Sequence, residues 1–254
     1  MKRRNFILTL ILSAGTACFA GNSQAAGAPQ KILCEGTYRG HLQGLDNDGE
    51  NIFWAFTTEL AKTDGNGKLL KKIDVPNHHG DLCCHDGVVY VAVNRGQFNK
   101  EPGKAVSEIW TFRTDDLSFI AKYDVPEVVH GAGGIAYRDG FFYVVGGLPD
   151  SYEENYVYQY TPDFKFVKRH VLKTGHTHLG FQTACFTQGK FWFGFYGKKG
   201  NPSGTMLVPP TLDTFERTRI HSDVGVTLWK NEIWLGKTSR TPDGWTGWLV
   251  PMQK

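Results

Sequence analysis

The sequence lacks the short motifs that mark the commonest enzyme mechanisms. It contains no GxSxG nucleophile turn, no P-loop, no HExxH helix and no GxGxxG turn after a strand. These absences exclude the standard signatures of serine hydrolases, nucleotide triphosphatases, zinc-helix proteases and dinucleotide-binding enzymes. No motif therefore names a reaction.

Net charge is also scarce. The 28 Lys and Arg residues face 25 Asp and Glu residues, and three of the bases lie within residues 1–25, which hold no acid. The rest of the chain therefore carries equal numbers of bases and acids. A nucleic-acid-binding face needs a marked excess of bases, so we expect no nucleic-acid partner.

Cysteines are few and carry no metal-binding spacing. Beyond residue 25 they are Cys34, Cys83, Cys84 and Cys185, without a CxxC pair. Adjacent residues of a strand point to opposite faces, so Cys83 and Cys84 are not expected to pair with each other. We expect all four to be packed core thiols, which behave as small hydrophobic groups.

Residues 1–25 have the pattern of a signal peptide. A basic stretch (residues 2–4) precedes an apolar run (residues 6–19) and a small-x-small cleavage site (residues 23–25). The run is too short for a good membrane span, and we expect no transmembrane segment elsewhere. We predict export to the periplasm or beyond. Lipid anchoring at Cys18 is the weaker alternative, because a poor lipobox precedes it.

Helical periodicity is nearly absent, and four short strands followed by a turn repeat instead. The clearest unit runs from Val128 to Val145, with an Asp139-Gly140 hairpin between two apolar strands. Five copies of the second strand follow hairpin signals of this kind: residues 52–56, 88–93, 141–145, 191–195 and 232–236. Such a period is typical of a repeat architecture.

The strand count predicts a closed ring. The fifth unit lacks an outer strand at the end of the chain, whereas one strand, residues 31–38, is unused at its start. Placed as the missing fourth strand, it closes the ring and removes exposed sheet edges. We predict a single five-bladed β-propeller over residues 26–254. An open β-sandwich is the alternative, although it does not explain the fixed four-strand order.

Histidines concentrate in the turns that enter each unit. Seven of the nine histidines lie in these five turns: His41, His78, His79, His130, His176, His178 and His221. In a propeller such turns converge on one face around the central channel. Neutral imidazole is a common ligand of Zn, Cu, Fe and Ni.

The turn histidines predict a metal site at the channel mouth. The expected ligands, one from each turn, are His41, His79, His130, His178 and His221. Whether His176 or His178 faces the channel stays open. Two alternatives also stay open: turn histidines that only bond a neighbouring blade, and a metal-free site for an anion or for proton transfer.

Loops between second and third strands share the histidine face and supply cations and aromatic rings. We expect ligand-binding roles for Arg95, Tyr196, Lys237, Arg240 and Trp245. Cations beside a metal suit an anionic ligand, and rings suit a stacked sugar. The alternative is that these long polar loops are simply solvated.

The strand order over the whole mature chain resembles the broad propeller superfamily that includes NHL-repeat and gluconolactonase-like proteins. The resemblance is closest to five-bladed secreted propellers. It is architectural, and it transfers no catalytic residue.

The combined reading is an exported, monomeric propeller. We expect it to hold a divalent metal ion (Zn, Fe, Mn or Cu) and to act on a small anionic or carbohydrate substrate as a hydrolase or lyase. The alternative is a non-catalytic module that binds glycan or protein through the same face.

Overall fold

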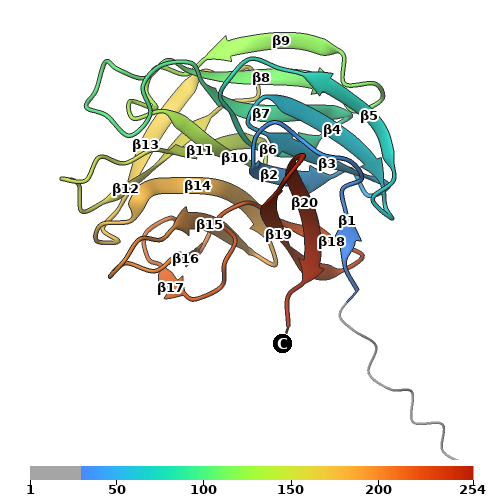
Figure 1. Ribbon diagram of the computed structural model, residues 1–254. Helices are drawn as coiled ribbons and strands as arrows, with labels where there is room; N and C mark the ends of the chain where they lie inside the picture. Colours follow the sequence, from blue (N-terminus) through green and yellow to red (C-terminus); the bar gives the residue numbers. More distant parts are fainter. Residues whose placement is uncertain (1–29, 254) are drawn as a thin grey trace, which may run out of the picture.

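The computed structural model describes residues 30–253, which form twenty strands and no helix. The strands make five antiparallel sheets of four strands each, arranged as the blades of a propeller (Figure 1). The predicted signal peptide and Cys18 lie outside the described residues. Across the described part, no helix is long and apolar enough to cross a membrane.

The first four blades are each built from four consecutive strands, with the first strand innermost. Blade 1 contains β2 (Leu42–Asn47), β3 (Asn51–Phe56), β4 (Glu59–Asp64) and β5 (Leu69–Asp74). Blade 2 contains β6 (His79–His85), β7 (Val88–Asn94), β8 (Ser107–Arg113) and β9 (Phe119–Asp124). Blade 3 contains β10 (Ala132–Arg138), β11 (Phe141–Gly146), β12 (Asn155–Tyr160) and β13 (Phe166–Leu172). Blade 4 contains β14 (His178–Thr187), β15 (Lys190–Tyr196), β16 (Gly204–Val208) and β17 (Glu216–Thr218).

Blade 5 joins the two ends of the described chain and closes the ring. Its strands are β18 (Val226–Trp229), β19 (Glu232–Thr241), β20 (Gly244–Pro251) and, outermost, β1 (Ile32–Leu33). β1 pairs with β20, and an isolated bridge joins Tyr38 to Trp245. The five-bladed propeller closed by the N-terminal strand is therefore confirmed. The closing strand is shorter than the predicted residues 31–38.

The hairpins between first and second strands have the backbone that their sequences predict. Asp86 and Asp139 have φ values of 46° and 48°, and Gly87 and Gly140 follow with 74° and 81°. Two successive residues with positive φ give the tight turn that matches strand twist. The Asp-Gly pairs thus fix where each blade turns back.

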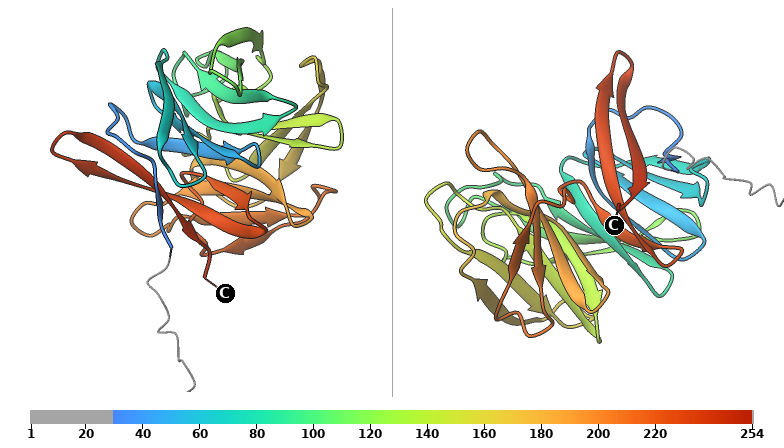
Figure 2. Two further views of the ribbon diagram at one scale, coloured as in Figure 1. Left: turned by 90° about the vertical axis from the view of Figure 1, so that its right-hand side faces the viewer. Right: turned by 90° about the horizontal axis from the view of Figure 1, so that it is seen from below.

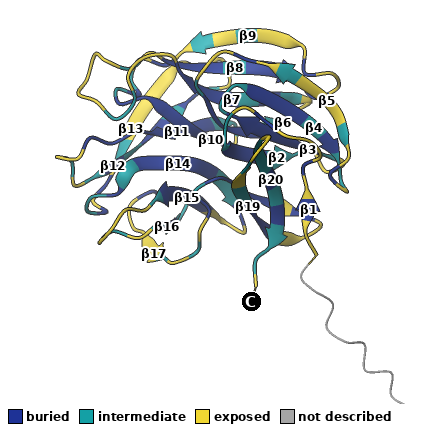
Figure 3. Cartoon of the chain, in the orientation of Figure 1, coloured by how far each residue is buried: buried dark blue, intermediate teal, exposed yellow. Residues whose placement is uncertain are grey.

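Burial falls from the channel to the rim of each blade (Figure 3). In β3 five of six residues are buried, because both faces of an inner strand pack against neighbouring blades. In the outer strand β9 no residue is fully buried. Trp54 and Phe56 lie in the core that joins blades 1 and 5. Apolar surface buried between blades stabilises the ring.

Asp81 ties three blades together at the channel axis. Its Oδ1 accepts a hydrogen bond from the Leu45 amide at 3.2 Å, and its Oδ2 accepts one from the Ala184 amide at 2.7 Å. Gly44 makes room for this carboxyl, since a Cβ there would lie 1.9 Å from Oδ1. Burial raises the pKa of Asp81 well above its usual value. The four described cysteines, predicted to be packed thiols, are unpaired.

Candidate metal centre and ligand pocket

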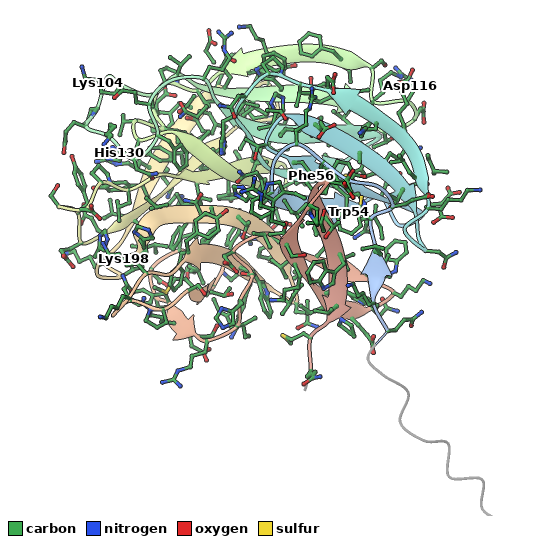
Figure 4. All side chains as sticks on the ribbon, viewed as in Figure 1. Trp54, Phe56, Lys104, Asp116, His130 and Lys198 are labelled. Atoms are coloured by element: carbon green, nitrogen blue, oxygen red, sulfur yellow. The ribbon has the colours of Figure 1, made fainter. Side chains whose placement is uncertain are left out.

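The turns that carry the histidines and the loops between second and third strands lie at the same end of the blades. Figure 4 places His130, Lys104 and Lys198 on one side of the molecule and Asp116, from an outer hairpin, on the other. We call the first side the histidine face. The chain order produces it, because every second antiparallel connection returns to the same end.

One group of three side chains on the histidine face has the geometry of a metal site. Asp150 lies in the β11–β12 loop, His176 in the β13–β14 connection, and His178 at the start of β14. Their ligand atoms all lie within 4.8 Å of one another, and among residues 30–253 no other group of three His, Cys, Asp or Glu does so. We call these residues the rim group.

The hydrogen bonds of the rim group leave two imidazole nitrogens free. His176 Nδ1 lies 3.0 Å from the Tyr152 carbonyl oxygen, which can only accept, so Nδ1 carries the proton and Nε2 carries a lone pair. His176 Nε2 and His178 Nδ1 are buried without a hydrogen-bond partner. A carbonyl that holds the far nitrogen of a ligand histidine is the usual second layer of a metal site.

The protonation states in the rim group suit a cation. Lys198 Nζ donates to Asp150 Oδ1 at 3.1 Å, and this bond lowers the pKa of Asp150, so the carboxylate is ionised at neutral pH. Burial lowers the pKa of His178, which keeps its imidazole neutral. Atoms about 2.0–2.1 Å from a shared ion lie roughly 3.3 Å apart. The Asp150 side chain is 81% exposed and can rotate to close the remaining gap.

A cavity of about 540 Å³ adjoins the rim group. His178 and Lys198 line one part of it, and Tyr196, His221 and Asp223 line the rest. His221 Nδ1 lies 2.6 Å from Ser203 Oγ, also in the wall. The cavity therefore offers one aromatic ring, one cation and several hydrogen-bonding groups beside three ligand atoms.

A second cluster lies where the chain enters blades 1 and 2. His41 and His78 come from the two entering turns, and Gln43 is the second residue of β2. Gln43 Nε2 lies 3.1 Å from His41 Nε2 and 3.1 Å from His78 Nε2. Tyr196 Oη lies 3.4 Å from His41 Nε2. We call His41, Gln43 and His78 the axis group. Tyr196 joins it to the cavity beside the rim group.

The five histidines predicted as ligands are not brought to one point. Within the described chain, His178 alone of the five belongs to the rim group, and His41 belongs to the axis group. His79 and His130 are buried, and their Nδ1 atoms donate to the carbonyls of Pro76 at 2.7 Å and Lys100 at 2.8 Å. His221 lies across the cavity.

The five residues predicted to bind a ligand also lie apart from one another. Tyr196 lines the cavity, and the Trp245 ring lies 5.5 Å from that of His41. Arg95 instead forms an ion pair of 3.0 Å with buried Glu108 beside a different cavity in blade 2. Lys237 Nζ donates to the His221 carbonyl oxygen at 3.2 Å. Arg240 is exposed opposite Trp245 on the β19–β20 hairpin, which stands out from the blades in Figure 2.

The sequence pattern does not mark Asp150, His78 or Gln43 as site residues, and it leaves open whether His176 or His178 faces the channel. A signal for His176 was present, because residues two apart on an extended chain share a face, so His176 and His178 point the same way. Nothing in the sequence marks Asp150 among the polar residues of its loop.

Comparisons with known proteins support the architecture. No protein-family model matches the chain, and no curated protein matches it in sequence. Among solved structures it is similar to a glutaminyl cyclase from Myxococcus xanthus, with a TM-score of 0.61 and 11% identity over 88% of this chain and 94% of that one. A chain of a nidogen/laminin complex has a TM-score of 0.50 and 9% identity over 76% and 70%. A gluconolactonase from Xanthomonas campestris has a TM-score of 0.44 and 12% identity over 80% and 69%. At 11% and 9% identity, the likeness to the cyclase and to the nidogen/laminin chain concerns the fold and leaves the activity to the site.

Proposed function

We propose that the protein is a metal-dependent enzyme of hydrolase or lyase type that acts on a small anionic or carbohydrate substrate. The observation that carries this proposal is the rim group, whose three ligand atoms lie within 4.8 Å of one another beside a cavity of about 540 Å³. Signal-peptide export would place this activity in the periplasm or outside the cell.

The donor set supports a catalytic rather than a purely structural ion. Two imidazoles and one carboxylate leave at least one coordination position for water or substrate, as catalytic zinc sites do. An ion held there would polarise a substrate oxygen or lower the pKa of bound water. Zn, Fe, Mn and Cu all accept this mixture of ligands.

The cavity lining favours the proposed substrate classes. Lys198 would attract a carboxylate or phosphate, although it shares its charge with Asp150 at 3.1 Å. The Tyr196 ring offers a face for a sugar, and Ser203 and Asp223 offer hydrogen bonds to hydroxyl groups. Sites of this type combine an apolar surface with a few placed polar groups.

A non-catalytic glycan-binding module is the second candidate. It is favoured by Trp245, which is half-buried on the projecting hairpin and lies beside His41 at the channel mouth. This function predicts that ligand affinity survives alanine at the rim-group histidines and falls in Trp245→Ala or Tyr196→Ala.

Metal content and turnover test the proposal together. Tag-free protein purified without chelator should contain bound metal, and calorimetric Zn²⁺ titration should show at least 100-fold weaker binding in His176→Ala and His178→Ala. His170→Ala is the matched control, because His170 lies on the outer strand β13, where its Nε2 atom is 3.1 Å from Gln159 Oε1. Turnover of esters, phosphates, lactones and oligosaccharides should stop with chelator and return with metal.

Two results would contradict the proposal. Absence of stoichiometric metal in both purified and Zn²⁺-titrated protein would remove the metal centre. Tight metal binding with saturable glycan binding but no turnover would favour the binding module. A peptide with an N-terminal glutamine is added to the substrates tested, because the fold is similar to that of a glutaminyl cyclase.

A further inference from the structure

We infer that the axis group is a second metal site, which takes Cu²⁺ or Zn²⁺ through His41 Nε2, His78 Nε2 and the side-chain amide oxygen of Gln43. Tyr196 Oη is in place as a fourth donor. This site uses none of the residues of the rim group, so it stands independently of the proposed function.

The distances are those of a coordination shell. Gln43 lies 3.1 Å from each imidazole nitrogen, and His41 lies 3.4 Å from the Tyr196 hydroxyl. Tetrahedral ligands at about 2.0–2.1 Å from an ion lie roughly 3.3 Å from one another. Each imidazole nitrogen therefore lies at a ligand's spacing from Gln43, and a shared ion would draw the two imidazoles towards each other.

The side-chain amide of Gln43 faces more groups than its nitrogen has hydrogens. The Gln43 amide nitrogen has two hydrogens but faces three groups at 3.1 Å: His41 Nε2, His78 Nε2 and Thr57 Oγ1. The two ends of an amide are nearly identical in shape, so the oxygen can occupy the same point. In that orientation the Gln43 oxygen and the lone pairs of the two imidazoles would face one another and would hold a cation between them.

The donor atoms and their surroundings determine which kind of ion the axis group can hold. Gln43 is 4% exposed, while His41 and His78 are half-buried, so the donors are fixed but reachable from the histidine face. No carboxylate makes a described contact with the three donors. Neutral imidazoles favour Cu²⁺ or Zn²⁺ over Ca²⁺ or Mg²⁺.

The axis group should bind its ion more weakly than the rim group. His176 Nδ1 is held by the Tyr152 carbonyl, whereas His78 Nδ1 is buried without a hydrogen-bond partner. Loss of such a second-layer partner typically lowers metal affinity about 10- to 100-fold. The wild-type protein should therefore bind two ions in separable steps.

The test is calorimetric titration of the tag-free protein with Zn²⁺ and Cu²⁺. Wild type should bind two equivalents. His41→Ala/His78→Ala should lose the weaker step at least 100-fold and keep the tighter one, and His176→Ala/His178→Ala should do the reverse. In the latter variant, electron paramagnetic resonance of bound Cu²⁺ should show coupling to two imidazole nitrogens.

A gain of affinity separates coordination from folding effects. Gln43→Glu places a carboxylate among the donors and should tighten the weaker step about 10-fold or more, which a misfolded variant cannot do. Gln43→Leu should weaken it. Unfolding midpoints in chelator are recorded for every variant.

The outcomes distinguish this inference from the proposed function. A single equivalent that is lost only in His176→Ala/His178→Ala overturns the axis site and leaves the rim site standing. A single equivalent that is lost only in His41→Ala/His78→Ala supports the axis site and removes the rim site. No binding overturns both, and unchanged binding in His41→Ala/His78→Ala overturns the axis site.

Discussion

The two ends of the central channel use their ionisable side chains in opposite ways. At the histidine face, nitrogens of His78, His176 and His178 are buried without a hydrogen-bond partner. At the other end, Asp46 accepts bonds from the Cys84 amide at 2.8 Å and the Thr227 hydroxyl at 2.7 Å. The innermost strands thus have imidazole nitrogens free to bind a ligand near one end and hydrogen bonds between blades at the other.

This difference follows from what each end must do for the ring. A buried polar atom without a partner costs about 1–3 kcal/mol, and the unpartnered imidazole nitrogens of His78, His176 and His178 lie at the histidine face, where binding would compensate for that cost. Asp46 and Asp81 have their acceptor atoms matched to donors from neighbouring blades. The opposite end also has a cavity of about 240 Å³, lined by residues of all five innermost strands. We therefore assign stability to the carboxylates and binding to the histidines.

The largest expected effect comes from Asp81. Asp81→Ala leaves the Leu45 and Ala184 amides without their acceptor and should lower the free energy of unfolding by about 3–5 kcal/mol. Denaturant unfolding measures this loss. His176→Ala should change stability by less than about 1 kcal/mol, and Asp81→Asn should fall between the two. Equal losses in Asp81→Ala and His176→Ala would erase the contrast between the stabilising carboxylates and the binding histidines.

His79 should make stability depend on pH. Burial lowers its pKa to about 4 in the folded protein, below the usual value of 6.5. The folded state therefore binds fewer protons than the unfolded chain, and stability present above pH 6.5 is lost as the pH falls towards 4. The loss attributable to His79 should be about 2 kcal/mol by pH 5.

Urea unfolding in chelator at pH 7.5 and pH 5 measures this effect. His79→Gln should show a smaller decrease than wild type between the two values. The same pH dependence in both proteins would show that His79 is not the group that titrates.

The sequence predicted the blades well because they depend on local rules. Period-two patterning and Asp-Gly turns fix strands and hairpins wherever one face is buried. The closing strand was predicted too long because Gly36, with φ of 104°, turns the chain after Leu33. The sequence of one strand does not show at which residue its pairing with the neighbouring strand ends.

The site was less predictable because the histidines enter the blades through irregular pairing. Register shifts lie at the start of β2, β6, β10 and β14, next to four of the turns. A shift of one residue sends a side chain to the other face. Adjacent residues also point to opposite sides of an extended chain, and His79 points into the core while its neighbour His78 faces Gln43. Repetition in sequence did not produce equivalent positions in space.

The smallest expected effect concerns Lys198, which competes with a metal ion for Asp150. Lys198→Met removes an exposed ion pair worth about 0–1 kcal/mol, so Zn²⁺ affinity at the rim group should rise a few-fold. Binding of an anionic ligand in the cavity should fall in the same variant. Calorimetry with Zn²⁺ and with inorganic phosphate measures both. A fall in Zn²⁺ affinity would mean that Lys198 supports the site rather than competing with the ion.

The most direct measurement is anomalous X-ray diffraction from crystals of the protein grown with Zn²⁺. We predict a zinc peak bonded to His176 Nε2, a nitrogen of His178 and a carboxylate oxygen of Asp150, with an open position towards the cavity beside Tyr196. Zinc-saturated crystals without a peak at these three residues would contradict the metal centre on which the proposed function depends.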